Sequence, residues 1–109
     1  MGALPVPEIK SPTEDTAVPA DGLEFRWSTG ARPEYTDFRL YKGTETVEKN
    51  MILKEKVDGG KSTFVVPAST FENGGTYAWA IKLVGSRKSR SVYAIFKIKE
   101  GGTHAVQAA

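Results

Sequence analysis

The stretch FENGGTYAWAIKL, residues 71–83, decides the fold of this 109-residue chain. A Gly-rich turn is followed by large apolar residues at alternate positions, namely Tyr77, Trp79, Ile81 and Leu83. A period of two is typical of a β-strand with one buried face, so these side chains are predicted to face a core. The other interpretation is an exposed aromatic platform that stacks on sugars. The continuation of the aromatic residues into an aliphatic stripe favours the core.

The same alternation recurs along the chain. It predicts strands at residues 8–10, 23–28, 37–42, 51–57, 62–66, 76–84 and 92–99. Residues 45–57 remain open between a strand and a helical turn, and the strand is favoured because DGG follows as a strong turn signal. Seven short strands separated by turn signals every 8–12 residues or so predict an all-β, antiparallel, seven-stranded β-sandwich of the immunoglobulin-like type.

The spacing in FENGGTY, residues 71–77, resembles a known family. It resembles the Leu-x-x-Gly-x-x-Tyr turn between strands E and F of fibronectin type III domains. The segments LEFRWS (23–28), DFRLYKG (37–43), STFVVP (62–67) and SVYAIFKIK (91–99) are similar, in order, to that family's strands B, C, E and G. The resemblance runs from Pro7 to Lys99 and is closest to divergent bacterial versions, in which an aromatic residue follows the corner tyrosine by two positions.

The resemblance implies structural roles for several residues of this chain. Tyr77 becomes a corner tyrosine whose hydroxyl binds the backbone a few residues upstream. Gly74 or Gly75 takes the positive φ of the turn. Phe71 closes the bottom of the sandwich, and Trp27 is the core tryptophan of the second strand.

Composition narrows the possible chemistry. The chain has no cysteine, and its only histidine is His104, so disulfides, thiol nucleophiles and zinc sites built on several imidazoles are excluded. No phosphate-binding loop or nucleophile elbow is present, so no enzyme activity, no cofactor and no metal are expected. Residues 1–73 carry nine basic and twelve acidic groups, and residues 74–109 carry six basic and one acidic. This local basic excess is too narrow for a nucleic-acid-binding domain, so no nucleic acid is expected.

Two places are candidates for contact with a partner or ligand. Arg87, Lys88 and Arg90 lie in SRKSR, at the predicted tip of the last hairpin, where three cations could hold phosphate, sulfate or a carboxylate-rich surface. A solvated loop is the alternative interpretation. Tyr41 and Tyr93, together with Ile95, would point outward from neighbouring strands and form a docking patch, unless they are scattered surface residues.

These features predict a domain organisation and a class of function. Residues 1–6 are expected to be a linker or a cloning remnant, residues 7–100 the sandwich and residues 101–109 a flexible tail. No signal peptide is visible and no run of about 18 apolar residues occurs, so membrane insertion is not expected. The resemblance implies a non-catalytic spacer or presenting module of a larger extracellular or cell-envelope protein, in contact with neighbouring domains or another surface protein. A module that binds a polysaccharide or anionic polymer through the basic loop is the alternative, and a surface-assembly subunit is a weaker one.

Overall fold

The computed structural model describes residues 4–100, and within them the chain forms seven strands and two single-turn 3₁₀ helices. The strands are β1 (Glu8–Ser11), β2 (Leu23–Ser28), β3 (Tyr35–Lys42), β4 (Met51–Asp58), β5 (Thr63–Val66), β6 (Thr76–Val84) and β7 (Val92–Lys97). The helices are η1 (Glu48–Asn50) and η2 (Ala68–Thr70). The tail predicted at residues 101–109 and the first three residues of the predicted linker lie outside the described residues.

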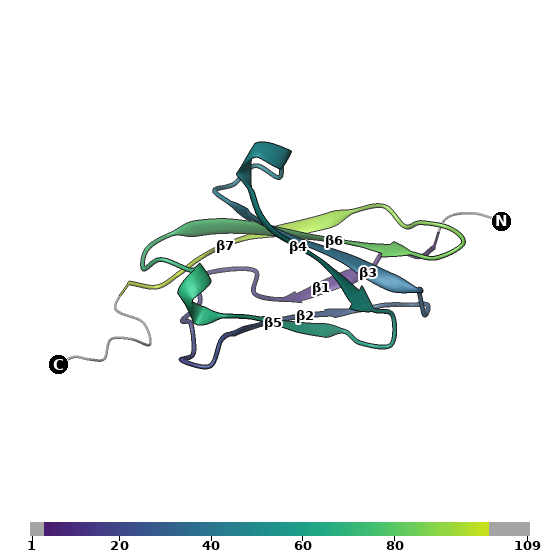
Figure 1. The fold of residues 1–109 in the computed structure, drawn as a ribbon, viewed down its shortest axis with the longest axis horizontal. Coiled ribbons are helices and arrows are strands. Elements are labelled where there is room, and N and C mark those ends of the chain that lie inside the picture. Colours follow the sequence, from purple (N-terminus) through teal and green to yellow (C-terminus); the bar gives the residue numbers. More distant parts are fainter. Residues whose placement is uncertain (1–3, 101–109) are drawn as a thin grey trace.

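The strands form two sheets that pack face to face (Figure 1). The three-stranded sheet has the order β1-β2-β5, and the four-stranded sheet has the order β4-β3-β6-β7. Every pairing between neighbouring strands is antiparallel. The predicted all-β sandwich is therefore confirmed, and β6, the longest alternating run in the sequence, lies inside the larger sheet.

Residues 45–57, which the sequence allowed to be either a helical turn or a strand, contain both. The N–H of Asn50 donates to the carbonyl of Val47 at 2.9 Å and closes the single turn η1. The strand β4 begins at the next residue and pairs with β3, with Leu53 opposite Leu40. This pairing turns Leu53 and Val57 toward the core, and the rest of β4 is mostly exposed. The apolar residues of an otherwise charged strand thus determine which of its faces is inside.

Aromatic side chains fill the space between the sheets. Phe25 has no exposed surface, and its ring lies between 5.0 and 6.3 Å from the rings of Phe38, Phe71, Trp79 and Phe96, measured between centroids. Three of these four contacts are edge-to-face, the arrangement that aromatic quadrupoles favour. Phe25 lies at the centre of the core, because from β2 of the three-stranded sheet it contacts rings of β3, β6 and β7 in the facing sheet and the ring of Phe71 in the turn before β6.

The turn before β6 is fixed by Tyr77. Its hydroxyl accepts a hydrogen bond of 2.9 Å from the backbone N–H of Glu72, and the side chain is 1 % exposed. Gly74 has a φ of 76°, in the left-handed region that glycine tolerates best. Phe71 packs edge-to-face on the Tyr77 ring at 5.1 Å. These contacts hold the turn against one end of the core.

One lateral edge of the sandwich is closed and the other is open. At the closed edge Thr16 forms a parallel bridge with Ile98, because its N–H donates to the Lys97 carbonyl and its carbonyl accepts from Lys99, both at 2.9 Å. Trp79 ties the same N-terminal segment down through a 2.8 Å hydrogen bond from Nε1 to the Pro12 carbonyl. At the other edge β4 and β5 end their sheets, and within residues 4–100 no pairing joins them.

The chain enters and leaves at opposite ends of the sandwich. The N–H of Leu4 donates to the Lys88 carbonyl at 3.3 Å, so the described chain begins beside the β6–β7 hairpin. The N–H of Gly74 donates to the Ile98 carbonyl at 2.9 Å, so the last described residues pass beside the β5–β6 turn. Because β6 runs from that turn to that hairpin, the two ends are separated by its length (Figure 1).

Candidate functional site

The β6–β7 hairpin carries the predicted basic residues on a rigid frame. Ser89 is 5 % exposed; its Oγ accepts from the Leu83 N–H and donates to the Arg90 carbonyl, both at 2.9 Å. Its N–H donates to the Leu83 carbonyl at the same distance. Arg87, Lys88 and Arg90 are exposed around this buried serine. The hairpin therefore presents three cations from a loop whose backbone is held by hydrogen bonds.

The second candidate region is the outer face, by which we mean the side of the four-stranded sheet that faces away from the three-stranded sheet. Side chains alternate across a strand, and paired residues share a face, so the register places them there. The residues of the outer face include Tyr35, Asp37, Arg39 and Tyr41 of β3, Lys54 and Lys56 of β4, Ala78, Ala80 and Lys82 of β6, and Tyr93 and Ile95 of β7.

The residues of the predicted tyrosine patch differ in their exposure to solvent. Tyr93 is 60 % exposed, and Ile95 on the same strand is 39 % exposed. Tyr41 lies on the outer face as well, but it is only 4 % exposed because it packs against Ala78, Ala80 and Met51. The prediction of an exposed Tyr41 is therefore wrong. The two alanines leave room for the Tyr41 ring at the foot of the β3–β4 connection, which rises above the outer face in Figure 1.

A groove of about 330 Å³ opens on the outer face between this connection and β7. The register explains its position, because Arg39, Ala80 and Tyr93 lie side by side on adjacent strands. The central side chain of the three is a single methyl group, so a depression forms between two long neighbours. The groove is lined by Asp37, Arg39, Tyr41, Thr46, Ala80, Lys82, Ser91 and Tyr93.

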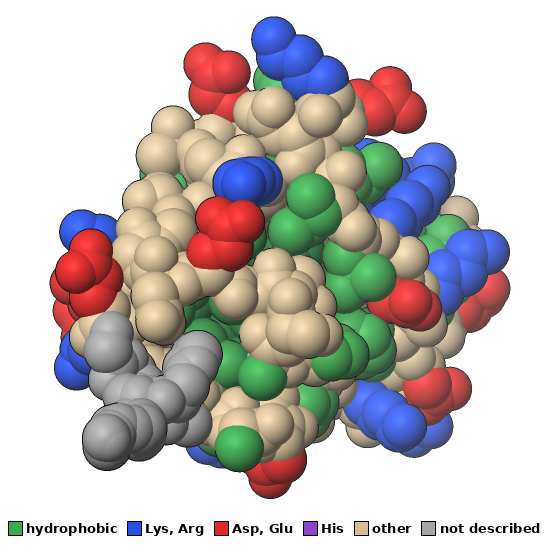
Figure 2. Space-filling view, turned by 60° about the vertical axis from the view of Figure 1, so that its left-hand side comes forward, with side chains coloured by type: hydrophobic (Ala, Val, Ile, Leu, Met, Phe, Trp, Pro, Cys, Tyr) green, Lys and Arg blue, Asp and Glu red, His purple; other side chains and the backbone are tan. Residues whose placement is uncertain are grey.

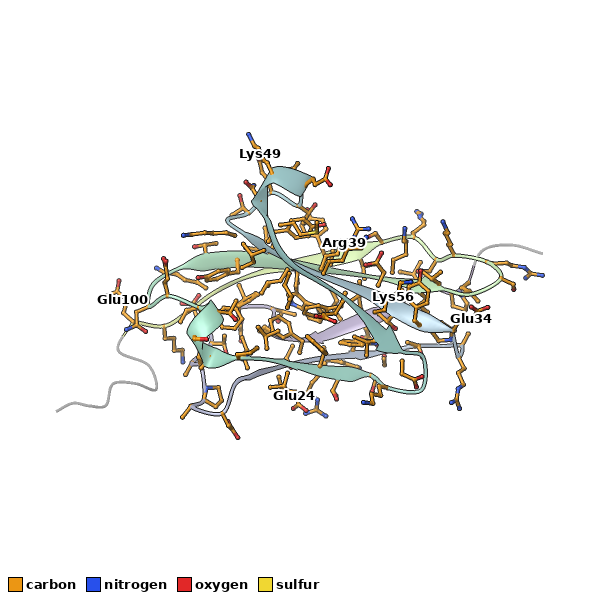
Figure 3. All side chains as sticks on the ribbon, viewed as in Figure 1. Glu24, Glu34, Arg39, Lys49, Lys56 and Glu100 are labelled. Carbon is orange, nitrogen blue, oxygen red and sulfur yellow. The ribbon has the colours of Figure 1, made fainter. Side chains whose placement is uncertain are left out.

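Asp37 holds Arg39 in position inside the groove. The Nε and Nη2 atoms of Arg39 donate to the two carboxylate oxygens of Asp37 at 3.2 and 3.1 Å (Figure 3 labels Arg39). These bonds raise the pKa of the Arg39 guanidinium above its ordinary value; burial opposes the shift and Tyr41 adds to it. The Asp37 side chain is 12 % exposed and that of Arg39 is 36 % exposed, so the pair is partly withdrawn from water. The guanidinium is thus both charged and fixed in orientation.

Further cations surround this pair. Lys82 and Lys56 lie on either side of Asp37 in the register, and the Lys56 ammonium lies 4.9 Å from the centre of the Tyr35 ring. Lys88 faces the same side as Lys82, because it forms an antiparallel bridge with Val84. The outer face therefore has a basic character that continues to the hairpin.

The other surfaces of residues 4–100 carry both hydrophobic and charged side chains. Figure 2 shows hydrophobic side chains across the middle of its view, with charged side chains of both signs mostly around the margin and a few among them. The exposed apolar residues include Ile52 of β4 and Val65 of β5, the two strands at the open edge. Residues 4–100 contain no group of three or more metal-ligating side chains, and their helices are single turns, none of which could span a membrane.

The sequence pattern did not predict that one groove is lined by Asp37, Arg39, Thr46 and Lys82. A signal was present, since two alanines at outward positions of a long strand leave space on its outer face. Only the pairing of β3 with β6 and of β6 with β7 shows which side chains surround that space.

Comparison of the chain with protein-family models and with curated protein sequences found no match.

Proposed function

We propose that this domain is a non-catalytic spacer or presenting module of a larger extracellular or cell-envelope protein, built like a fibronectin type III domain. The strand orders β1-β2-β5 and β4-β3-β6-β7 support this likeness, as does the buried hydroxyl of Tyr77 at the turn before β6. Contacts with neighbouring domains or another surface protein use the outer face and the β6–β7 hairpin.

The position of the chain ends carries the spacer proposal. A domain whose chain enters at one end and leaves at the other holds its two neighbours apart. The parallel bridge between Thr16 and Ile98 strengthens such a spacer. When the two ends are pulled apart, its two hydrogen bonds are loaded in shear and must break together, which resists force better than opening them one at a time.

Single-molecule pulling on a tandem array of the domain tests this function. We expect each domain to unfold in one cooperative step that lengthens the array by about 300 Å, because roughly 97 described residues extend to about 340 Å at about 3.5 Å each and the folded domain already spans part of that length. Thr16→Pro removes the N–H that donates to Lys97 and should lower the unfolding force. Thr16→Ala keeps that N–H and is the matched control. Extension without a force peak would contradict the spacer function.

The exposed cations of the hairpin favour a second candidate function, the binding of an anionic polymer. Dextran sulfate is a suitable probe. We expect its binding to weaken at least about tenfold when salt is raised from about 0.05 to about 0.5 M, because exposed charges are screened. The double variant Arg87→Ala with Arg90→Ala should bind at least about tenfold more weakly. Lys49→Ala with Lys61→Ala makes the same change in charge elsewhere on the surface. Equal weakening in both double variants would exclude a site at the hairpin.

A further inference from the structure

The groove on the outer face combines features that suit a ring-shaped polar ligand. Ala80 forms its floor, and Tyr93 and Arg39 rise on either side from adjacent strands. Its volume of about 330 Å³ lies at the lower end of the range typical of small-ligand sites. The groove is therefore large enough for a small ring.

The charge of the groove is unbalanced. Arg39 and Lys82 contribute two positive charges, and Asp37 compensates one of them. Asp37 uses two of the five N–H donors of the guanidinium, so Arg39 keeps donors for a ligand. A planar guanidinium held in one orientation matches a carboxylate better than a mobile ammonium does. One carboxylate on the ligand would balance the charge.

The remaining lining is amphipathic. The Tyr93 ring is 60 % exposed and offers an apolar surface at one wall. Hydroxyl groups of Thr46, Ser91 and Tyr41 also line the groove and can both donate and accept hydrogen bonds. A sugar ring is amphipathic in the same way. Its C–H face is apolar and packs on aromatic rings, whereas its hydroxyl groups need hydrogen-bond donors and acceptors.

We propose that the groove binds an acidic sugar, one uronate unit of a polysaccharide, with its ring against Tyr93 and its carboxylate on Arg39. Lys56 and Lys88 lie farther along the outer face and provide charges for the neighbouring uronate units of the same polymer. This inference goes beyond the spacer function and is independent of it, because an empty groove does not change how the domain carries load.

An acidic segment of a partner protein fits these observations less well. A protein partner binds best where the centre of the contact is apolar and poor in charges. Here the centre holds the Arg39–Asp37 ion pair, and the one well-exposed aromatic side chain of the lining stands at the wall. The lining favours a ligand that is polar over most of its surface.

An NMR titration of the 109-residue protein with a galacturonate tetrasaccharide tests the proposal, with the fully methyl-esterified tetrasaccharide as the uncharged match. We expect the acidic sugar to bind at least about tenfold more tightly and to shift resonances of Ala80 and Tyr93. Tyr93→Ala should weaken binding about tenfold or more, whereas Ile95→Ala, on the same face of β7, should change it less than about twofold. Arg39→Lys keeps the charge but loses the planar donors, and should also weaken binding about tenfold.

Several results would overturn the proposal. These are no binding at millimolar concentration, equal binding of the esterified sugar, and binding that Arg87→Ala with Arg90→Ala abolishes while Tyr93→Ala leaves it unchanged. Poly-glutamate that binds as tightly as the acidic sugar, without dependence on Tyr93, would point instead to an acidic protein partner. Circular dichroism of each variant confirms the fold. If Arg39→Lys disturbs it, Lys82→Gln tests the charge without breaking the Arg39–Asp37 pair.

Discussion

Replacement of Phe25 by alanine is expected to lower the free energy of unfolding by about 3 to 5 kcal/mol. Phe25 has no exposed surface, and from the three-stranded sheet it touches three aromatic rings of the facing sheet and the ring of Phe71 in the turn before β6. Its loss therefore leaves a cavity that its packed neighbours cannot fill. A domain of this size has roughly 5 to 15 kcal/mol in total, so a large share of the stability depends on this one side chain. Urea unfolding, followed by the fluorescence of Trp27 and Trp79, measures the change.

Phe64→Ala is the matched control for this prediction. Phe64 lies directly opposite Phe25 in the pairing of β2 with β5, but it is only half-buried and contacts the single ring of Phe38. We expect about half the loss of stability. Equal effects of the two substitutions, or a loss below about 1.5 kcal/mol for Phe25→Ala, would contradict the central position of Phe25 in the core.

Removal of one oxygen atom in Tyr77→Phe is expected to cost about 1 to 3 kcal/mol. The phenolic oxygen accepts the Glu72 N–H at 2.9 Å inside the turn, and phenylalanine would leave that donor without its partner. The ring itself would remain between Phe71 and Phe96, so the packing does not change. Thermal and urea unfolding of the purified variant give the change in stability.

Tyr93→Phe provides the comparison for the corner tyrosine. It removes the same atom from an exposed ring on the outer face, and its effect on stability should stay below about 0.5 kcal/mol. A Tyr77→Phe variant as stable as Tyr93→Phe would mean that the hydroxyl does not hold the turn.

Much of the fold follows from local pattern. The alternation in residues 23–28 and 76–84 predicts β2 and β6 with their observed bounds, because both strands bury one face against the other sheet. The last strand ends two residues earlier than the alternation suggests. Ile98 and Lys99 continue the pattern but donate to Gly75 and Thr16 rather than to β6. Local pattern identifies which residues are buried, and it does not identify their hydrogen-bond partners.

The candidate site was predictable in part. The position of the basic residues at the β6–β7 hairpin could be predicted from the sequence, because the run SRKSR lies between two predicted strands. The groove depends on the register between strands that are far apart in sequence, which places Arg39 beside Ala80 and Ala80 beside Tyr93. Tyr41 illustrates the same limit, because alternation gives the direction of its side chain but not its burial against Met51.

The open edge has a consequence for how copies of the domain behave when they are crowded. β4 is an eight-residue edge strand, and the backbone groups that it does not share with β3 form a template on which another strand could grow. Lys54, Glu55 and Lys56 lie in the middle of this strand and carry charge to its edge. Their charges oppose the pairing of β4 with an edge strand of another copy, which disfavours aggregation. Were copies of the domain placed side by side, these three residues, which take no part in the core, would hinder the joining of their edge strands into one continuous sheet.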